Sequence, residues 1–587
     1  MGSKVVASAP APRPAGPSIA IIGAGIGGIT LGIELDKRGL TNWTMYERDD
    51  GIGGTWYQNR YPGCRCESVP AIVYSHSSYP NPNWSQTHPD REEIQAYWAN
   101  LAGSRGQLPR IKLRHSVVRA DWDTKRSLYV IQIRDLAKNQ VKTIEASILI
   151  TASGGLSTPR YIELPGKENF DGKVIHAGDW PRDLSVDDLR GKTVVVVGNG
   201  CSGVQLVGTL GLESDINIVS LSRGRQWFVP SPPGSSRNSV PYSKAQNERW
   251  AKYPALQQLT RFIYCCVMDS HFYWYLEKDG KKQRKKIEEE ISNWMLKELP
   301  EYMRDTAIPK HSFGAKRLIF EDGYFAALNK PNVKHIEGRI ASLHGHTVVL
   351  DDGREMSADY VVLCTGYDAE RVGIPVKGVY DSTEHYKSRA EVKMYHGVAI
   401  PGIPNFFNVL GNNMGLNHMS ITTVIEIQTN YIGQLVQGMR DYSIPVLDVK
   451  RAPALEYDAW IAKELEKMTW MEVKNYWRGN NGHGRIFTHY PGSVRRLLWD
   501  NAYPLWGDYN GGAPVVRRQR LKRGVLALAL VVAGYWATKT GLSAQAVQTL
   551  VQWASGLVAV GKALPQVVVG AVGLFADKGR ALLSATQ

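Results

Sequence analysis

The residues whose spacing most clearly suggests chemistry are three glycines near the start of the chain. Gly23, Gly25 and Gly28 follow a short apolar run and open a segment with helical periodicity. In such a strand, turn and helix, the first glycine makes the turn, the second admits a pyrophosphate, and the third lets the helix pack on the strand. Glu47 ends the next apolar run, roughly 20 residues later, where a carboxylate can bond ribose hydroxyls. We therefore predict a dinucleotide site of the FAD type.

A second copy of this pattern lies in the middle of the chain. Gly198, Gly200 and Gly203 follow a strand made almost entirely of valine. Here the next apolar run is followed by Arg223 and Arg225 in place of an acid. Arginine at this position suits a ribose that carries a 2′-phosphate, whereas the alternative is that both are solvated surface residues. We predict that the second site binds NADPH.

Two dinucleotide folds in one chain, the second inserted in the first, indicate an α/β protein of two Rossmann-like domains. The apolar runs 148–155 and 360–368 end in small residues and glycine, as expected where the chain crosses between the domains. The predicted divisions are a disordered leader at 1–17, the first part of the FAD domain at 18–155, the NADPH domain at 156–365, the return of the FAD domain at 366–510, and a basic and apolar C-terminal tail at 511–587.

The amino-acid composition limits the kinds of molecule that this protein is expected to bind. Lys and Arg number 70 against 55 Asp and Glu, and the resulting charge of +15 favours anionic partners such as cofactor phosphates or membrane headgroups. The sequence contains no zinc-finger, homeodomain or RNA-binding signature, and its six cysteines form no CxxC pair. We therefore expect neither nucleic acid nor a metal as a partner, and a reducing compartment. The leader lacks the apolar core of a signal peptide.

Four further stretches carry a family resemblance. Residues 170–181, FDGKVIHAGDWP, lie just before the second glycine turn and match the pattern FxGxxxHxxxWP. This pattern resembles the fingerprint of Baeyer-Villiger monooxygenases, which are class B flavin monooxygenases. The stretches GGTWYQNRYPGCRCE from Gly53, GAKRLIFEDGYF from Gly314 and GNNMGLNHMS from Gly411 resemble three other segments of that family. Together the matches extend over residues 18–510.

The resemblance implies an activity and several roles. NADPH would reduce FAD, the reduced flavin would capture O₂, and one oxygen atom would be inserted beside a ketone carbonyl to give an ester or lactone. Arg317 falls where the family has its active-site arginine, a fixed cation beside the developing negative charge; the alternative is a surface salt bridge. His176 and Trp180 would lie at the domain junction, with His176 as a hydrogen-bonding linker or simply a packing histidine. The other residues expected at the cofactors are Gly54, Thr55, Trp56 and Ser202.

The sequence departs from the family pattern at several positions. Glu67 stands where an Asp that orients Arg317 is expected, and Ser68 is the alternative occupant of that place. A carboxylate longer by a methylene would shift the geometry on the scale that alters rates. Other departures, in the fourth stretch, are Asn412, Met414 and Asn417. Hydroxylation, epoxidation or heteroatom oxygenation on the same scaffold therefore stays open, as does a flavin scaffold or redox partner without oxygenation.

The remaining segments concern the substrate and the membrane. Residues 240–310 show helical periodicity and many aromatics, which we interpret as core residues of helices that cover the active site. Arg517 to Arg523 form a basic cluster before the apolar run 524–537, which is shorter than a bilayer span. We expect a membrane-associated tail on the cytoplasmic side; the alternative is a helical hairpin packed on the protein or on a second subunit. A bulky, lipophilic natural-product ketone would suit such an enzyme, and the sequence leaves the oligomeric state open.

Overall fold

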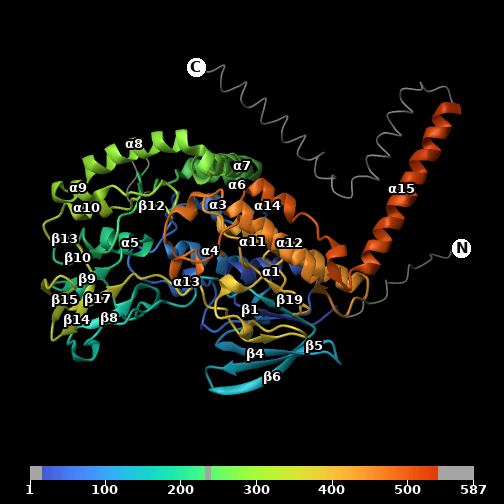
Figure 1. Ribbon diagram of the computed structural model, residues 1–587, viewed down its shortest axis with the longest axis horizontal. Helices are drawn as coiled ribbons and strands as arrows, with labels where there is room; N and C mark the ends of the chain where they lie inside the picture. The colour runs from blue at the N-terminus through green and yellow to red at the C-terminus, as the bar shows by residue number, and fades with distance from the viewer. Residues whose placement is uncertain (1–15, 232–238, 540–587) are drawn as a thin grey trace, which may run out of the picture.

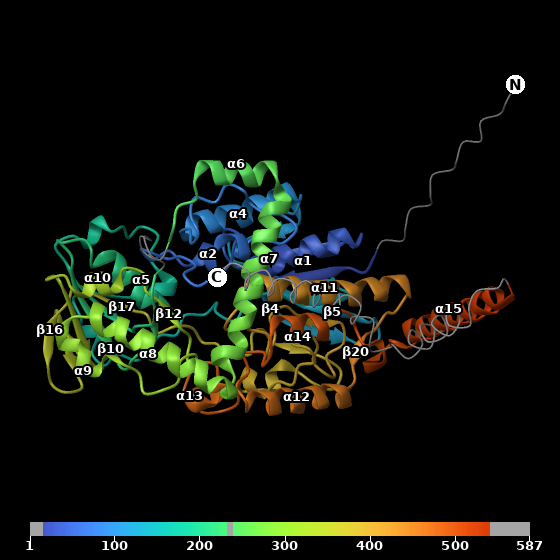
Figure 2. The same ribbon diagram turned by 90° about the horizontal axis from the view of Figure 1, so that it is seen from above.

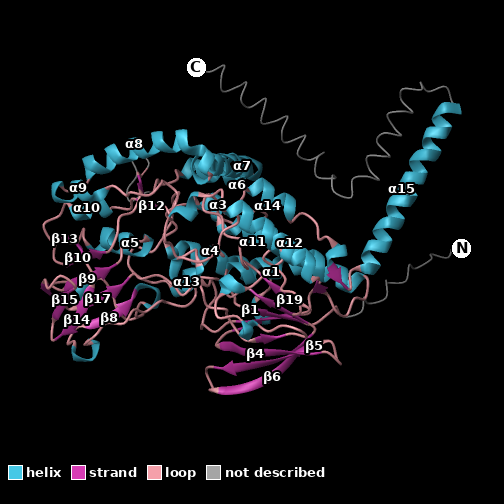
Figure 3. Cartoon of the chain, in the orientation of Figure 1, coloured by secondary structure: helices cyan, strands magenta, loops and turns pink. Residues whose placement is uncertain are grey.

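The computed structural model describes residues 16–231 and 239–539 and is built on two five-stranded parallel sheets (Figures 1 and 3). The first sheet has the strand order β19-β7-β1-β2-β3. Its strands are β1 (Ile19–Ile22), β2 (Trp43–Tyr46), β3 (Ile111–Lys112), β7 (Ile148–Thr151) and β19 (Phe406–Asn408). Strands from both ends of the sequence thus pair side by side, because β19 joins β7 some 250 residues later.

The second sheet consists of strands that lie between β7 and β19 in the sequence. Its order is β13-β10-β9-β17-β8, and all its pairings are parallel. The strands are β8 (Lys173–His176), β9 (Thr193–Val197), β10 (Asn217–Ser222), β13 (Val333–Glu337) and β17 (Tyr360–Leu363). This insertion of one parallel α/β unit within another confirms the predicted fold class.

Smaller strands and the helices complete the layers. A smaller sheet flanks each parallel sheet. Beside the first lie the antiparallel strands β4 (His115–Asp123), β5 (Leu128–Asp135) and β6 (Gln140–Ala146), with β18 (Val376–Lys377) paired in parallel to β4. Beside the second lie the antiparallel strands β14 (Ile340–His344), β15 (Thr347–Leu350) and β16 (Glu355–Ser357). Short pairs are β11 (Phe228–Val229) with β12 (Ile319–Phe320), and β20 (Asp448–Val449) with β21 (Tyr509–Asn510). The helices are α1 (Ile26–Lys37), α2 (Thr55–Gln58), α3 (Ala71–Tyr74), α4 (Arg91–Ser104), α5 (Cys201–Leu210), α6 (Lys244–Lys252), α7 (Pro254–His271), α8 (Lys281–Glu298), α9 (Arg304–Ala307), α10 (Tyr324–Leu328), α11 (Ile421–Asp441), α12 (Arg451–Leu465), α13 (Gly479–Gly482), α14 (Val494–Asp500) and α15 (Ala513–Lys539).

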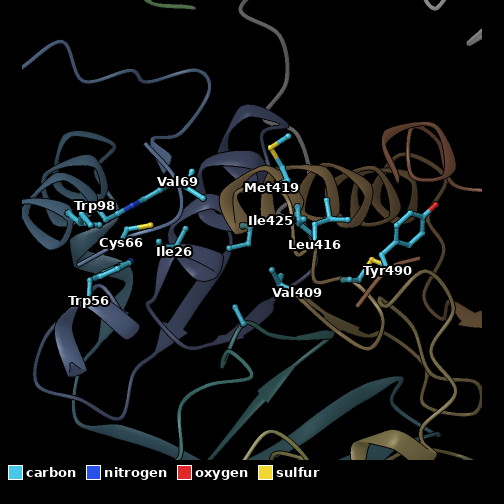
Figure 4. Close-up of a cluster of buried hydrophobic side chains, with 14 of the residues drawn as sticks. Ile26, Trp56, Cys66, Val69, Trp98, Val409, Leu416, Met419, Ile425 and Tyr490 are labelled. Atoms are coloured by element: carbon cyan, nitrogen blue, oxygen red, sulfur yellow. The ribbon is translucent and has the colours of Figure 1, made fainter. Parts of the chain in front are cut away.

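The largest hydrophobic core joins segments that are distant in sequence. Helices α1 and α11 pack against each other on the first sheet. Figure 4 shows Ile26 of α1, Trp56 of α2 and Ile425 of α11 in one buried cluster. Burying such side chains removes a large apolar area from water, at about 25 cal/mol per Å². The core therefore fixes the first glycine turn, the loop after it and the N-terminal half of α11 relative to one another.

The two glycine-rich turns have the same backbone geometry. Gly23 and Gly198 each open their turn with a positive φ, of 99° and 112°. A Cβ on Gly28 would lie 2.0 Å from the carbonyl oxygen of Gly23, and a Cβ on Gly203 would lie 1.9 Å from that of Gly198. In each turn the third glycine therefore lets the helix start directly against the strand, as the spacing predicted.

The helical region between the sheets differs from one expectation. Helix α7 lies between the two halves of the molecule, and α8 leads from it toward the half that holds the second sheet (Figure 2). The aromatic residues of this region were expected to be core, and for Phe262, Tyr264, Tyr273 and Trp274 that prediction is wrong, because each is 41–53% exposed. The fully buried residues of α7 are polar, Cys265 and Met268 are partly buried, and the other large apolar residues face outward.

The C-terminal tail is described only as far as α15. The basic cluster and the apolar run that follows it form one continuous helix, which projects from the body of the molecule (Figure 1). Within the described residues, no helix combines the length and apolarity that crossing a bilayer requires. Residues 540–587, on which the expected membrane association of the tail also depended, lie outside the described residues.

The close contact of Gly203 with Gly198 predicts a difference in stability between two glycine substitutions. Gly203→Ala should lower the free energy of unfolding by about 2–3 kcal/mol, because its Cβ would overlap a backbone carbonyl that can move only with its strand. The matched control is Gly200→Ala, whose Cβ meets nothing within 4 Å and should cost less than about 1 kcal/mol. Denaturant unfolding measures both. Equal losses would contradict the packing role of Gly203.

Candidate active site between the two glycine-rich turns

The loop from Gly53 packs directly on the first glycine turn. The amide of Gly53 donates to the carbonyl of Ala24 at 3.0 Å. A Cβ on Gly54 would lie 2.9 Å from the Cα of Gly25, and Gly54 has a φ of +57°. Only glycine suits both constraints, because a side chain at either position would separate the two backbones. The two sequence motifs thus form one backbone cradle whose amides and lack of side chains suit a pyrophosphate.

Glu47 lies beside this cradle at the end of β2. Its carboxylate is buried and accepts hydrogen bonds from the amides of Ala24 at 2.7 Å and Asp49 at 2.9 Å. Burial raises the pKa of this carboxyl group, and the two backbone hydrogen bonds oppose that rise. Each carboxylate oxygen keeps a further lone pair for a hydroxyl group. Glu47 therefore lies directly after β2, beside the glycine turn, and its hydrogen bond from Ala24 also holds that turn.

The second glycine turn and the Gly53 loop meet at Arg317. The guanidinium donates from Nη2 to Oε1 of Glu67 at 3.2 Å, and from Nε to the sulfur of Cys201 at 2.9 Å. Cys201 is the first residue of α5, directly after Gly200. Arg317 itself precedes β12, so three distant segments converge on one side chain. The carboxylate that contacts Arg317 is thus that of Glu67.

A hydrogen-bonded chain holds Glu67 from behind. The side-chain nitrogen Nε2 of Gln205, on α5, donates to Oε2 of Glu67 and, at 3.0 Å, to the carbonyl of Arg65. The hydroxyl of Tyr61 donates to the amide oxygen of Gln205 at 2.8 Å. Glu67 is 4% exposed, whereas the Arg317 side chain is 43% exposed. The carboxylate is therefore fixed within the protein, and the guanidinium presents donors to the space in front of it.

The remaining residues of the two motifs divide between core and surface. Trp56 is buried, and its indole nitrogen donates to the hydroxyl of Tyr74 at 3.0 Å. Thr55 is exposed at the start of α2, and Ser202 is half-buried in the first turn of α5. Ser202 follows Cys201, which contacts Arg317, whereas Trp56 packs in the core behind the backbone cradle.

Asn412, which departs from the family pattern, and its neighbour Asn413 tie the loop from Gly411 to its surroundings. Asn412 is buried and donates from Nδ2 to the carbonyls of Arg389 at 2.6 Å and Val392 at 3.0 Å. Asn413, with a φ of +57°, donates from Nδ2 to the carbonyls of Ile486 and His489. Asparagine tolerates this left-handed conformation better than most residues. The side chains of Asn412 and Asn413 therefore fix the loop.

The FxGxxxHxxxWP stretch lies on the edge of the second sheet. His176 ends β8, is buried, and its Nδ1 accepts a hydrogen bond from the amide of Gly178 at 3.0 Å. Burial lowers the pKa of His176, so it stays neutral at pH 7. The ring of Tyr367 lies 6.2 Å from that of His176, and its hydroxyl donates to Asn59 beside the first turn. Trp180 is buried and donates to the carbonyl of Leu184. This geometry puts His176 next to a link between the two halves.

The two arginines after β10 differ in their surroundings. Arg223 is exposed directly after the strand. Arg225 is partly covered, and its Nε lies 3.9 Å from a carboxylate oxygen of Glu337 at the end of β13. Both lie at the carboxyl end of the second sheet, the edge where ligands bind in open α/β sheets. Arg223 is the better placed of the two to contact an added anion.

Sequence reasoning missed several residues of this site. Cys201 and Gln205 lie within the second glycine motif but were assigned no role, although their spacing places both on the first turns of α5. His489 and Arg389, the latter at the start of a short 3-10 helix, belong to no sequence motif and gave no signal. Arg389 lines a cavity at the carboxyl ends of β7 and β19, and burial lowers its pKa to about 10. It therefore remains a cation at neutral pH.

Comparison with known proteins finds relatives that are named Baeyer-Villiger monooxygenase. Residues 21–88 match the family model of an NAD(P)-binding Rossmann-like domain. The chain is 28% identical to a Baeyer-Villiger monooxygenase of Streptomyces coelicolor over 77% of this chain and 84% of the relative. It is 29% identical to a Baeyer-Villiger monooxygenase of Pseudomonas aeruginosa over 82% of this chain and 88% of the relative. The chain is therefore similar, over most of its length, to proteins named Baeyer-Villiger monooxygenase.

A further relative and two solved structures show the same similarity. The FAD-binding monooxygenase ktnD of Aspergillus niger is 27% identical over 86% of this chain and 83% of the relative. A solved structure of OTEMO in complex with FAD and NADP has a TM-score of 0.72 at 20% identity, and covers 84% of this chain and 99% of that chain. A closed structure of cyclohexanone monooxygenase has a TM-score of 0.71 at 22% identity, and covers 83% of this chain and 96% of that chain. The resemblance stated from the sequence is confirmed, and so is the fold.

Burial of His489 should make the free energy of unfolding of this protein depend on pH. Its ring packs 4.3 Å from that of Trp477, and burial followed by the charge of Arg317 lowers its pKa to about 3. In the unfolded chain the pKa is about 6.5, so the unfolded state binds more protons and stability falls as pH drops below that value. From pH 6.5 to 5 this one group should cost about 2 kcal/mol. His489→Gln should remove that loss in denaturant unfolding, whereas the exposed His344→Gln should keep it. A wild-type pH slope in His489→Gln would show the prediction to be wrong.

Proposed function

We propose that this chain is an FAD- and NADPH-dependent monooxygenase that inserts one oxygen atom of O₂ beside a ketone carbonyl, giving an ester or lactone. The observation that carries the proposal is the Glu67–Arg317 pair, held between the two glycine-rich turns. In the balanced reaction, ketone, O₂, NADPH and a proton give the ester, NADP⁺ and water. The relatives named Baeyer-Villiger monooxygenase support this assignment.

The residues of the chain fit both cofactors. The cradle made by Gly23, Gly25 and Gly54 would hold the pyrophosphate of FAD, with Glu47 at its ribose. The turn of Gly198, Gly200, Ser202 and Gly203 would hold that of NADPH. When bound, the flavin accepts a hydride from NADPH and supplies the chemistry that activates O₂. Metal ligation is not part of the proposal: the residues described hold no cluster of His, Cys, Asp and Glu suited to a metal.

Arg317 would stabilise the negative charge that develops on oxygen during the reaction. A guanidinium stays protonated at any working pH and directs several donors in one plane. Glu67 and Cys201 fix two of its nitrogens, and burial raises the pKa of the Cys201 thiol to about 12, so that its sulfur is a neutral partner. A fixed donor of this kind avoids reorganisation in the transition state, which is the main source of electrostatic catalysis. Gln205 acts indirectly, by holding Glu67.

For the substrate, we propose a bulky, lipophilic natural-product ketone. Its support is the aromatic character of the segment beside Arg317. Tyr476 is 46% exposed, and Trp470 and Trp477 pack behind it around His489. Such side chains favour a large apolar molecule through burial of its surface.

The role of Arg317 predicts a loss of product without a loss of cofactor oxidation. Arg317→Ala should reduce the rate of ester formation at least about 100-fold, because one fixed charge donor is removed, while NADPH oxidation continues. Product analysis by mass spectrometry with ¹⁸O₂ and a panel of ketones measures the oxygen transferred. Arg134→Ala, an exposed arginine on β5, is the control. Full ester formation by Arg317→Ala would exclude the proposed role, and a hydroxylated product of the wild type would favour hydroxylation on this scaffold.

The arginines after β10 predict the choice between NADPH and NADH. Replacing Arg223 and Arg225 together with alanine should weaken NADPH use about 10- to 100-fold, since each charge-assisted hydrogen bond to a phosphate is lost. The effect of Arg223→Ala should exceed that of Arg225→Ala, because Arg225 already lies near Glu337. Steady-state kcat/KM for both nucleotides measures the preference. If the double variant kept the wild-type ratio, these arginines would have no part in reading the 2′-phosphate.

A further inference from the structure

Helix α7 has the reverse of the usual distribution of polar and apolar residues. Its buried residues are Gln257, Arg261 and Asp269, all polar. Its exposed side carries large apolar side chains, which are 38–54% exposed. We call this side the α7 apolar face, and its residues are Leu256, Leu259, Phe262, Ile263, Tyr264 and Val267. A helix on the surface of a globular protein normally shows the opposite arrangement.

The buried polar residues fix the orientation of α7. Nη1 of Arg261 donates to the carbonyls of Ile72 at 2.9 Å, Val73 at 3.0 Å and Ser75 at 2.7 Å, which cap the C-terminal end of α3. Asp269 accepts from the amide of Val494 at 2.6 Å. Rotating the helix to bury its apolar side would leave these charged groups and carbonyls unpaired, at a high cost. The protein therefore holds the α7 apolar face outward.

Aromatic and basic residues continue this surface beyond the helix. Tyr273 and Trp274 follow α7 directly and are 45% and 47% exposed. The first turns of α8 then present four exposed lysines, Lys281, Lys282, Lys285 and Lys286. The acid exposed between the aromatic pair and these lysines is Asp279. Apolar residues, then a Tyr-Trp pair, then a lysine cluster form the pattern of a helix that lies in the plane of an anionic membrane surface.

We propose that the α7 apolar face docks into the headgroup boundary of an anionic lipid bilayer, with the α8 lysines on the headgroups. Figure 1 places α7 and α8 together along one edge of the molecule, so both can meet one plane. In-plane docking needs no helix long enough to span the bilayer. A symmetric contact with a second copy would also bury the apolar residues, and it would bring the exposed Glu289 and Glu290 of α8 as partners for the lysines, so the tests below separate that occupant from lipid. The surface is independent of the catalytic assignment.

A fluorescent probe on α7 tests the occupant of this face. Cys266 is exposed on the helix and the other five cysteines are less exposed, so an environment-sensitive NBD label can be placed there in the full-length protein. Vesicles of phosphatidylcholine with phosphatidylserine should shift its emission to the blue. Vesicles of phosphatidylcholine alone should give a much smaller shift, and Cys266→Ser shows the background labelling. A blue-shifted probe before vesicles are added, with a dimer in sedimentation, would assign the face to a second copy and overturn the proposal. A blue-shifted probe on a monomer would do the same, by showing the face covered by the chain itself.

Substitutions on the same face give an independent measurement. The variant Phe262→Glu, Ile263→Glu, Val267→Glu should bind anionic vesicles about 10- to 100-fold more weakly in co-sedimentation, because three inserting side chains become charged. The matched control is Leu136→Glu, Val141→Glu, which charges two exposed apolar residues, 47% and 53% exposed, at β5 and β6. Replacing the four α8 lysines with glutamine should remove the preference for anionic vesicles. NADPH oxidation should be unchanged in all three variants: the α7 variant, its control and the lysine variant. Vesicle binding by the α7 variant equal to that of the wild type, or no binding by either, would overturn the proposal.

Discussion

The close approach of Gly25 and Gly54 is the contact on which the rest of the structure depends. It joins the first glycine turn to the loop that carries Glu67, so the position of the carboxylate follows from the position of the cofactor cradle. A single methyl group at either glycine would push the loop away. Because the second α/β unit supplies Gln205 and Cys201 to the same place, the two halves of the molecule meet at a carboxylate and a guanidinium.

The site combines a rigid inner part with an accessible outer part. Glu67 has its oxygens occupied by Gln205 and Arg317, and the protein surrounds it almost completely. Arg317 remains open toward the space between the turns. This arrangement suits a charge that must be present before the reaction begins, because a buried, hydrogen-bonded carboxylate limits the orientations of its partner. Gln205 of α5 and Arg317 together hold the carboxylate of Glu67.

The glycine turns and the α7 apolar face are two surfaces of the molecule that differ in the groups they expose. The inner surfaces of the glycine turns expose backbone amides where anionic cofactor groups would bind. The α7 apolar face exposes side chains that water solvates poorly, and it is held in place by Arg261 and Asp269 on the opposite side of the helix. Since Arg261 binds the carbonyls that end α3, which follows the Glu67 loop by a few residues, the outward face and the site share one support.

The sequence alone determined both glycine turns, the α/β class and the insertion of one unit in the other, because strand, turn and helix leave local patterns of glycine and apolar residues. It also marked Glu67 and Arg317, through short motifs. It did not determine that Cys201 and Gln205 contact them, that His489 packs on Trp477, or that the aromatics of α7 face outward. Those facts depend on which distant segments meet. Periodicity shows that a helix has an apolar side, but only the tertiary structure decides whether that side is buried, and here polar anchors hold it in solvent.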